Sequence, residues 1–444
     1  MHARVIFVTP QELMSENCTS VVPEQRSMSM SMEEASGTSN DFDGRDLDAF
    51  IDSINEDFSK LSGCLCRAAK DCSGGLGLFA ARDICKGERV MVEVPFAAFP
   101  YQHSRPFTCA ACLKDSRRFS GKDANAVMHD GWERRCQGCG VLRFCSEACE
   151  IALSARHSRE CAALAKIAKF EGETMMPAAG PNGGDLLSHA IRVLADRQSG
   201  TRVQVYSGRT CGYDCHRTRL VGIERGVATS ATIQQAVDVA LHAMPMAARV
   251  PPAELFDVLS RLQCNSHAVC SEGGHTLARA AFVGSLNLFN HSCAPNVCFD
   301  SVPVPFTAEM TAVAGDADAA YSGSASSSAF APTSVPTSVP TSAPASSPAF
   351  SIVSLSDVRS GTELCLSYVS TDVEVSKRRE HLREQYGFDC SCERCRSEDC
   401  SAEDRNGQEA AYVYEAPPRC VHDQCGTGYM VGGRCVHCGR TVSG

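Results

Sequence analysis

Two short segments of the chain alternate apolar and polar residues, which predicts strands with one buried face. The apolar positions are Val90, Val92 and Val94 in residues 88–94, and Leu364, Leu366 and Tyr368 in residues 363–369. Between these segments the apolar spacing becomes helical, with three stripes: Leu187, Ile191 and Leu194; Ile233, Val237 and Leu241; and Leu255, Leu259 and Leu262. The pattern predicts an α+β chain in which strand-rich parts flank a helical insert.

Two stretches lack apolar periodicity. Residues 1–60 are acidic and polar and include the run Ser27–Met32 of alternating serine and methionine, so we expect a disordered tail. Residues 315–349 consist mainly of Ser, Ala, Pro, Thr and Val. This composition predicts a flexible excursion, which a folded domain tolerates if the two ends leave at a hairpin.

The chain has 444 residues, enough for roughly two to four domains. No window approaches the ~18 consecutive apolar residues of a membrane-spanning helix and no secretory signal is evident, so we expect a soluble intracellular protein without a membrane partner. The net charge of −10 disfavours a nucleic-acid partner and favours basic ones. No dense basic cluster is present, so cytoplasm and nucleus both stay open.

The 27 cysteines cluster in closely spaced pairs, which favours metal thiolates over disulfides in a chain of this kind. One group supplies eight soft ligands, enough for two tetrahedral zinc sites: Cys109, Cys112, Cys136, Cys139, Cys145, Cys149, His157 and Cys161. Cys145 and Cys149 are four residues apart, and so are His157 and Cys161. Both pairs lie along residues 146–170 or directly before them, a segment that we expect to be helical. A helix would place each pair on one face.

Two more cysteine groups follow towards the C-terminus. Cys390, Cys392 and Cys395 need a fourth ligand, for which Cys293 is the candidate. The other group reads as a small zinc ribbon made by Cys420, Cys425, Cys435 and Cys438. Incomplete sets remain open as ligands, with core or surface cysteines as the favoured interpretation: Cys211, Cys215 and His216; and Cys264, His267 and Cys270.

The segment Asn290–Asn296 is dense in hydrogen-bonding groups and lies between the apolar residues 282–289 and 297–299. Its residues alone predict a polar loop in a core. As a nucleophilic site it is poor, because Ser292 and Cys293 beside His291 lack a visible orienting acid.

The ligand order, together with Arg143-Phe144-Cys145-Ser146, resembles a MYND zinc finger. The resemblance implies interleaved ligation: Cys109, Cys112, Cys145 and Cys149 on one ion, and Cys136, Cys139, His157 and Cys161 on the other. It also implies a module that binds peptides, often proline-rich ones. The stretch from Leu113 to Arg135 is longer than the family's usual loop.

Four segments in register resemble SET domain signatures. They are Gly75–Ala81 for the opening glycine turn, Asn290–Asn296 for the NHSCxPN loop, Gly361–Tyr368 for the strand ending in tyrosine, and Tyr386–Cys395 for the post-SET segment. In this chain a MYND finger lies between the first predicted strands and a helical insert. This order of parts resembles the SMYD class of SET protein-lysine methyltransferases, and the resemblance covers about residues 61–400.

The SMYD resemblance implies methyl transfer from S-adenosylmethionine to a histone or non-histone lysine. The implied cofactor contacts are the backbone of Leu76 and Gly77 and the residues Asn290, His291, Phe388 and Tyr368, with Asn287 as a possible addition. Tyr368 would be the catalytic residue, with its hydroxyl at the reacting methyl and amine. Tyr386 and Phe388 would line the lysine channel.

The implied organisation divides the chain into seven parts. They are a disordered tail (1–60), the first SET part (61–104), the MYND finger (105–165), a helical insert (166–280), the SET core (281–375, interrupted at 315–349), the post-SET segment (376–400) and a zinc ribbon (401–444). We expect four zinc ions: two in the finger, one post-SET and one in the ribbon.

Two other functions compete with an active methyltransferase. A silent SET and MYND scaffold could recruit proline-rich partners to a transcription or chromatin complex. The presence of Asn290, His291 and Tyr368 together favours activity, because a silent scaffold has no chemical need for them. A zinc protein that binds nucleic acid is disfavoured by the net acidity.

Overall fold

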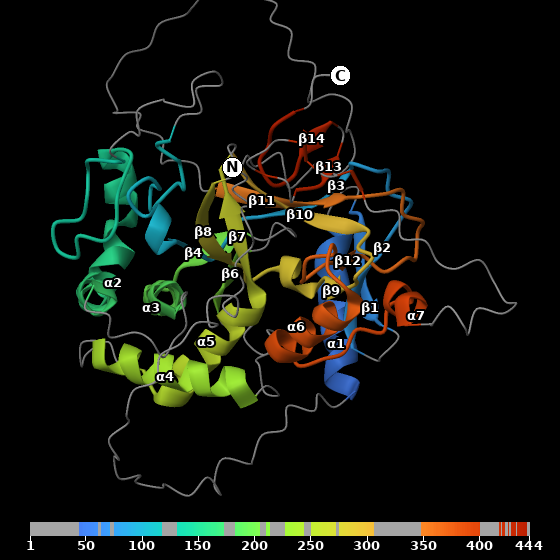
Figure 1. The fold of residues 1–444 in the computed structure, drawn as a ribbon, viewed down its shortest axis with the longest axis horizontal. Coiled ribbons are helices and arrows are strands. Elements are labelled where there is room, and N and C mark those ends of the chain that lie inside the picture. The colour runs from blue at the N-terminus through green and yellow to red at the C-terminus, as the bar shows by residue number, and fades with distance from the viewer. Residues whose placement is uncertain are drawn as a thin grey trace, which may run out of the picture.

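The computed structural model combines helices with short strands and confirms the predicted α+β class (Figure 1). It describes residues 44–60, 64–71, 75–117, 131–172, 183–204, 210–213, 227–243, 250–271, 275–305, 348–399 and 417–441, the last range with gaps at 419, 422–424, 426–427 and 432. In Figure 1 helices α2 and α3 lie on the left, α4 lies at the lower left, and α7 lies on the right.

Helix α1 (Gly44–Ser59) corrects the predicted tail, of which residues 1–43 lie outside the described part of the chain. Its side chains Phe50, Ile54 and Phe58 are buried against the core formed by the strands. They recur at helical spacing in the sequence, a signal that the disorder prediction overlooked. The Asn55 amide bonds both backbone groups of Ala68, at 2.9 and 2.8 Å. The helix therefore covers the outer edge of the first hairpin, β1 (Cys66–Lys70) and β2 (Leu76–Ala80).

The central sheet has the order β10-β11-β3 and is antiparallel, built from β3 (Arg89–Glu93), β10 (Val297–Pro305) and β11 (Pro348–Ser354). Both faces of β3 are buried, not one as its alternation predicted. Pro305 pairs with Pro348, so the excursion does leave and return at a hairpin. Its predicted end is wrong by two residues, because Pro348 and Ala349 already belong to β11 and are buried.

A second sheet, β4-β8-β7, consists of β4 (Ala97–Pro100), β7 (Ser266–Cys270) and β8 (Thr276–Ala281). Helix α2 (Glu147–Gly172) begins within the finger and is followed, in the described ranges, by α3 (Gly183–Gln198), α4 (Val227–Ala243) and α5 (Pro252–Asn265). The three predicted apolar stripes lie on α3, α4 and α5, one on each helix. Their residues are buried, except Leu241, which is partly buried. The insert predicted over residues 166–280 is not wholly helical, because β7 and most of β8 lie before residue 280, and β8 pairs with both β7 and β4. A small hairpin, β5 (Arg202–Gln204) with β6 (Thr210–Gly212), also interrupts the insert.

The predicted strand over residues 363–369 is reduced to β12 (Cys365–Leu366), which pairs in parallel with β9 (Asn290–His291). The Leu364 N–H donates to the Leu78 carbonyl of β2, and other backbone groups in and next to β12 bond to side chains. Asn296 accepts from the Cys365 N–H at 2.9 Å and donates to the Glu363 carbonyl at 2.7 Å. The polar loop thus takes the place of a neighbouring strand.

The short helices η2 (Gln102–Ser104) and η7 (Ser285–Leu288) occupy the turns after β4 and β8. The buried carboxylate of Glu93 accepts the Ser285 N–H at 2.7 Å and the Leu286 N–H at 3.3 Å, which fixes the start of η7 and so the approach to β9. The chain continues through α6 (Val375–Tyr386) and α7 (Glu393–Asp399) to the hairpin β13 (Met430–Val431) with β14 (Arg434–Cys435).

None of the helices in the described ranges is long and apolar enough to cross a membrane. Two large clusters of buried apolar side chains form the core. One contains α1 and the strands. The other joins the finger to α3, α4 and α5, so the finger shares a hydrophobic core with the helical insert.

Candidate functional site

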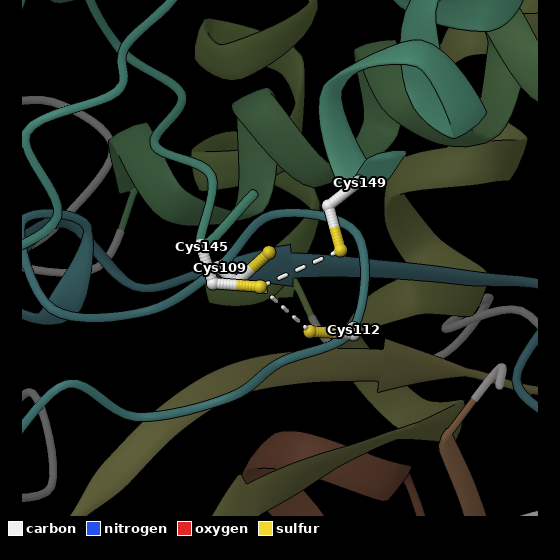
Figure 2. A group of neighbouring side chains, drawn as sticks. All are labelled: Cys109, Cys112, Cys145 and Cys149. Atoms are coloured by element: carbon white, nitrogen blue, oxygen red, sulfur yellow. Dashed lines mark hydrogen bonds between the residues drawn. The ribbon is translucent and has the colours of Figure 1, made fainter. Parts of the chain in front are cut away.

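The first metal-type cluster of the finger joins Cys109, Cys112, Cys145 and Cys149 (Figure 2). Cys145 lies just before α2 and Cys149 lies in its first turn. The Cys145 sulfur is 3.6 Å from that of Cys112 and 3.5 Å from that of Cys149. Sulfurs bonded at ~2.3 Å to one tetrahedral zinc ion lie about 3.8 Å apart, whereas a disulfide requires about 2.05 Å. The geometry fits a metal ion.

The second cluster of the finger joins Cys136, Cys139, His157 and Cys161, so the two ligand sets interleave as the MYND resemblance implies. The Cys136 and Cys161 sulfurs are 3.7 Å apart, and His157 Nε2 lies 3.7 Å from the Cys139 sulfur. A Cβ on Gly138 would come within 2.8 Å of the Cys161 sulfur. Glycine at this position gives the ligand room to approach.

Behind His157 lies a buried ionic network that the sequence did not reveal. His157 Nδ1 is 2.9 Å from the carboxylate of Glu160, which accepts two bonds of 2.6 Å from Arg192 on α3. Glu160 and Arg192 are almost fully buried. Burial opposes the charge of Glu160, but Arg192 and His157 hold its pKa below the ordinary value. The carboxylate fixes the imidazole so that Nε2 faces the thiols.

A third cluster joins Cys293 from the polar loop with Cys390, Cys392 and Cys395 from the C-terminal segment. The Cys293 and Cys390 sulfurs are 3.9 Å apart. Arg378 of α6 is buried beside the cluster, with its guanidinium 3.7 Å from the Cys395 sulfur and 2.6 Å from Glu398. The predicted fourth ligand is therefore in place, and a cation stands next to thiols that would be anionic when bound to metal.

The fourth cluster joins the four buried cysteines Cys420, Cys425, Cys435 and Cys438. The incomplete sets form no metal-type cluster among the described residues. Cys211 is buried in the helical core, Cys264 contacts the Gln385 carbonyl, and the ring of His267 stacks on Phe299. Cys215 and His216 lie outside the described residues.

Asn290 lies against the opening glycine turn. Its amide nitrogen donates to the Leu76 carbonyl at 3.0 Å and to the carboxylates of Asp71 and Glu363 at 3.1 and 2.9 Å. A Cβ on Gly77 would come within 2.7 Å of the Glu363 carboxylate, so glycine leaves this group room to lie against β2. Two carboxylates beside a glycine strand form a site suited to a cationic ligand.

His291 connects the polar loop to Tyr368. Burial lowers the pKa of His291 to about 4, so its ring is neutral near pH 7. Nδ1 accepts the Tyr368 N–H at 3.0 Å, which leaves the hydrogen on Nε2, 3.3 Å from the Cys293 sulfur. The His291 ring therefore links the third cysteine cluster to Tyr368, and its side chain is engaged within the protein.

Three aromatic side chains gather around this link. The Tyr368 hydroxyl donates to the Phe289 carbonyl at 2.5 Å, and its ring centroid lies 5.0 Å from that of Tyr386. Burial raises the pKa of Tyr368 above its ordinary value and that of Tyr386 to about 12, so both hydroxyls are neutral near pH 7. Phe388 packs against His291 with ring centroids 5.9 Å apart.

The Asn287 amide nitrogen donates to the Phe282 carbonyl at 2.7 Å, so its place in the cofactor site stays a prediction. No motif or spacing in the sequence singled out Asp71, Glu160, Arg192 and Arg378 as parts of these sites. Glu363 lies within the quoted Gly361–Tyr368 segment but was given no role. Only the fold brings Asp71 and Glu363, far apart in the sequence, to the same amide group.

Comparisons with known proteins find histone-lysine methyltransferases among the relatives of this chain. The histone-lysine N-methyltransferase SMYD3 of Homo sapiens is 22% identical over 76% of this chain and 63% of its own length. The histone-lysine N-methyltransferase ASHR1 of Arabidopsis thaliana is 20% identical over 80% of this chain and 59% of its own length. The chain therefore spans about six-tenths of the length of these curated relatives.

A SET and MYND domain-containing protein of Dictyostelium discoideum is 26% identical over 35% of this chain and 22% of its own length. A solved structure, the SET domain of LSMT bound to lysine and AdoHcy, has a TM-score of 0.34 and 10% identity over 79% of this chain and 59% of that one, too low to support an inference.

Residues 75–369 match the SET domain family model, and the relatives confirm the expected resemblance to the SMYD class. Since the match covers more than half of its residues, this chain belongs to the SET domain family.

Proposed function

We propose that the protein transfers a methyl group from S-adenosylmethionine to a lysine side chain of another protein. The observation that carries the proposal is the β9–β12 junction. There Asn290, in the carboxylate-lined site at Gly77, is the direct neighbour of His291, which bonds to the backbone of Tyr368. The proposed cofactor site at Gly77 and the aromatic group around Tyr368 thus meet where β9 pairs with β12.

The residues around Gly77 fit the proposed cofactor. S-adenosylmethionine, when bound, supplies a methyl group on a cationic sulfur and also carries an ammonium group. The carboxylates of Asp71 and Glu363 would attract these positive charges, and the absence of a side chain at Gly77 allows close approach. Phe388, beside His291, would cover the adenine or wall the lysine channel.

The aromatic group around Tyr368 fits an acceptor lysine. A lysine amine has an ordinary pKa near 10.4 and attacks only when neutral, so it must enter a poorly hydrated site that lowers this pKa. The partly buried rings of Tyr368 and Tyr386 provide such a wall. The Tyr368 hydroxyl uses its hydrogen on the Phe289 carbonyl, which leaves its oxygen lone pairs to face positive charge.

For the finger we propose a role in docking peptides, including proline-rich ones, beside the catalytic domain. The shared core of the finger with α3 to α5 supports a fixed position for this module. The net charge of −10 supports basic partner proteins, among which histones are one class.

Replacing Asn290 with alanine tests the cofactor site. We expect S-adenosylmethionine to bind at least about tenfold more weakly, because the variant loses the amide group and its hydrogen bonds in the cofactor site. Hydrogen bonds to charged groups contribute about 1.5–3 kcal/mol each. Isothermal titration calorimetry gives the dissociation constant. Asn287→Ala serves as the comparison and should stay within about threefold of wild type, since Asn287 bonds the Phe282 carbonyl instead. Equal affinity of Asn290→Ala and wild type would remove Asn290 from the cofactor site.

A further inference from the structure

The four-cysteine unit at residues 417–441 lies beyond residues 75–369, the part that matches the SET family. Its sulfurs meet in two close pairs, Cys420 with Cys438 and Cys425 with Cys435, each 3.7 Å apart. This is close to the ~3.8 Å edge of a tetrahedron of sulfurs around zinc. All four cysteines are buried, and all four sulfurs lie within 4.8 Å of one another.

The backbone around Cys435 is shaped for a thiolate. The N–H groups of His437 and Cys438 point at the Cys435 sulfur, at 3.3 and 3.4 Å. A Cβ on Gly428 would come within 2.3 Å of the same sulfur, so the chain passes too close for any side chain there. These backbone donors would hydrogen-bond to the sulfur of a metal-bound cysteine and hold it in position.

The unit sits on an irregular edge of the central sheet. Strand β10 is an edge strand, and its pairing with β11 breaks between Asp300 and Val304. At this break the Ser301 N–H donates to the Val436 carbonyl at 3.1 Å. Arg434 forms an ion pair of 2.7 Å with Asp300, which is almost fully buried. The C-terminal unit therefore covers an edge that would otherwise expose backbone groups.

An apolar contact and two polar contacts extend this attachment. Val431 and Val436 join a small buried cluster with residues of β10 and of the β11 end: Cys298, Val353 and Leu355. The ring of His437 lies 3.6 Å from the sulfur of Cys270 on β7. The Tyr429 hydroxyl lies 3.0 Å from that of Thr371, which is buried three residues after Tyr368. The unit thus touches both main sheets and the segment that follows Tyr368.

We propose that residues 417–441 form a zinc-dependent clamp, in which a fourth zinc ion folds the unit and the folded unit holds the β10 edge and the segment after Tyr368. In the described residues of the unit the paired strands are the two-residue strands β13 and β14, and few apolar side chains are buried. So small a segment needs a metal ion to order it. The metal and the attachment are consequently coupled, since Val436 and His437 lie between the ligands Cys435 and Cys438.

The double variant Cys425→Ser/Cys438→Ser of the full chain tests the clamp, with the exposed Cys85→Ser as the matched control. Elemental analysis should give one zinc ion fewer per chain in the double variant than in wild type and the control. Hydrogen–deuterium exchange should become at least about tenfold faster in residues 298–304 and 369–372, and stay unchanged in α2. Unchanged zinc would overturn the metal assignment. Unchanged exchange, or an equal rise in α2, would overturn the local clamp.

Arg434→Gln removes an attachment without touching a ligand. We expect the zinc content of wild type together with faster exchange in residues 298–304, because Asp300 loses its partner. If zinc is retained and exchange is unchanged, the Arg434 contact does not hold the edge and the clamp is contradicted. Neither measurement uses a methyl donor or a substrate, so the clamp can fail while the proposed methyl transfer holds, and the reverse.

Discussion

Replacing Tyr368 with phenylalanine is expected to lower kcat by about 10²-fold or more while changing cofactor affinity little. The variant keeps the ring that packs against Tyr386 and loses only the hydroxyl held by the Phe289 carbonyl. That oxygen is neutral, because burial raises the pKa of Tyr368, and would act through its lone pairs on the positive charge carried by the transferred methyl. Steady-state kinetics and calorimetry on the same preparation separate kcat from cofactor binding.

Tyr101→Phe is a suitable control for this substitution. Tyr101 stacks on His103 at the far end of β4, at a ring distance of 5.7 Å, and has no part in the proposed site. It should keep the activity of wild type. Activity of Tyr368→Phe within about threefold of wild type would contradict the role of the hydroxyl. A loss accompanied by an equal loss of cofactor affinity would instead place Tyr368 in cofactor binding.

Glu160→Gln is expected to cost about 3–5 kcal/mol of unfolding free energy, since it leaves the buried guanidinium of Arg192 without its close counter-charge. It should also weaken zinc binding in the finger by roughly 10–100-fold, because the carboxylate orients His157. Urea unfolding of the zinc-loaded protein measures the first effect. Competition with a chromogenic chelator measures the second.

The matched control is Glu150→Gln, on the same helix α2 and also paired with an arginine. Both partners, Glu150 and Arg134, are exposed and lie 2.8 Å apart, so the expected loss is at most about 1 kcal/mol, with no change in zinc binding. If the two glutamine variants were equally stable, the buried network would not be what joins the finger to α3.

Residue types and local spacing are what made the cysteine clusters predictable. All sixteen residues expected as ligands fall into the four groups that the fold brings together. Close pairs such as Cys109 and Cys112 are readable because short chain segments restrict their separation. Assigning Cys293 to Cys390, Cys392 and Cys395 spans a long stretch of sequence, and the three-thiol count alone asked for a fourth ligand from elsewhere in the chain.

The sequence failed where tertiary contacts override local preference. The strand expected over residues 363–369 shrinks to Cys365–Leu366, because Asn296 and His291 side chains take the backbone bonds that a neighbouring strand would make. The ion pair between Glu160 and Arg192 joins two helices, and no spacing rule connects residues so far apart. The missed helix α1 is different, since Phe50, Ile54 and Phe58 already show its period.

The most direct test of the central claim is to incubate the zinc-loaded wild-type chain with methyl-labelled S-adenosylmethionine and a mixture of cellular proteins, and then to hydrolyse the products. Amino-acid analysis should find the label on the side-chain nitrogen of lysine, with initial labelling lowered about 10²-fold or more for Tyr368→Phe and, at cofactor concentrations below the dissociation constant, about tenfold or more for Asn290→Ala. Tight cofactor binding without labelled lysine would contradict the proposed enzyme and favour a silent scaffold. Equal lysine labelling by wild type and both variants would contradict the site assigned to the reaction.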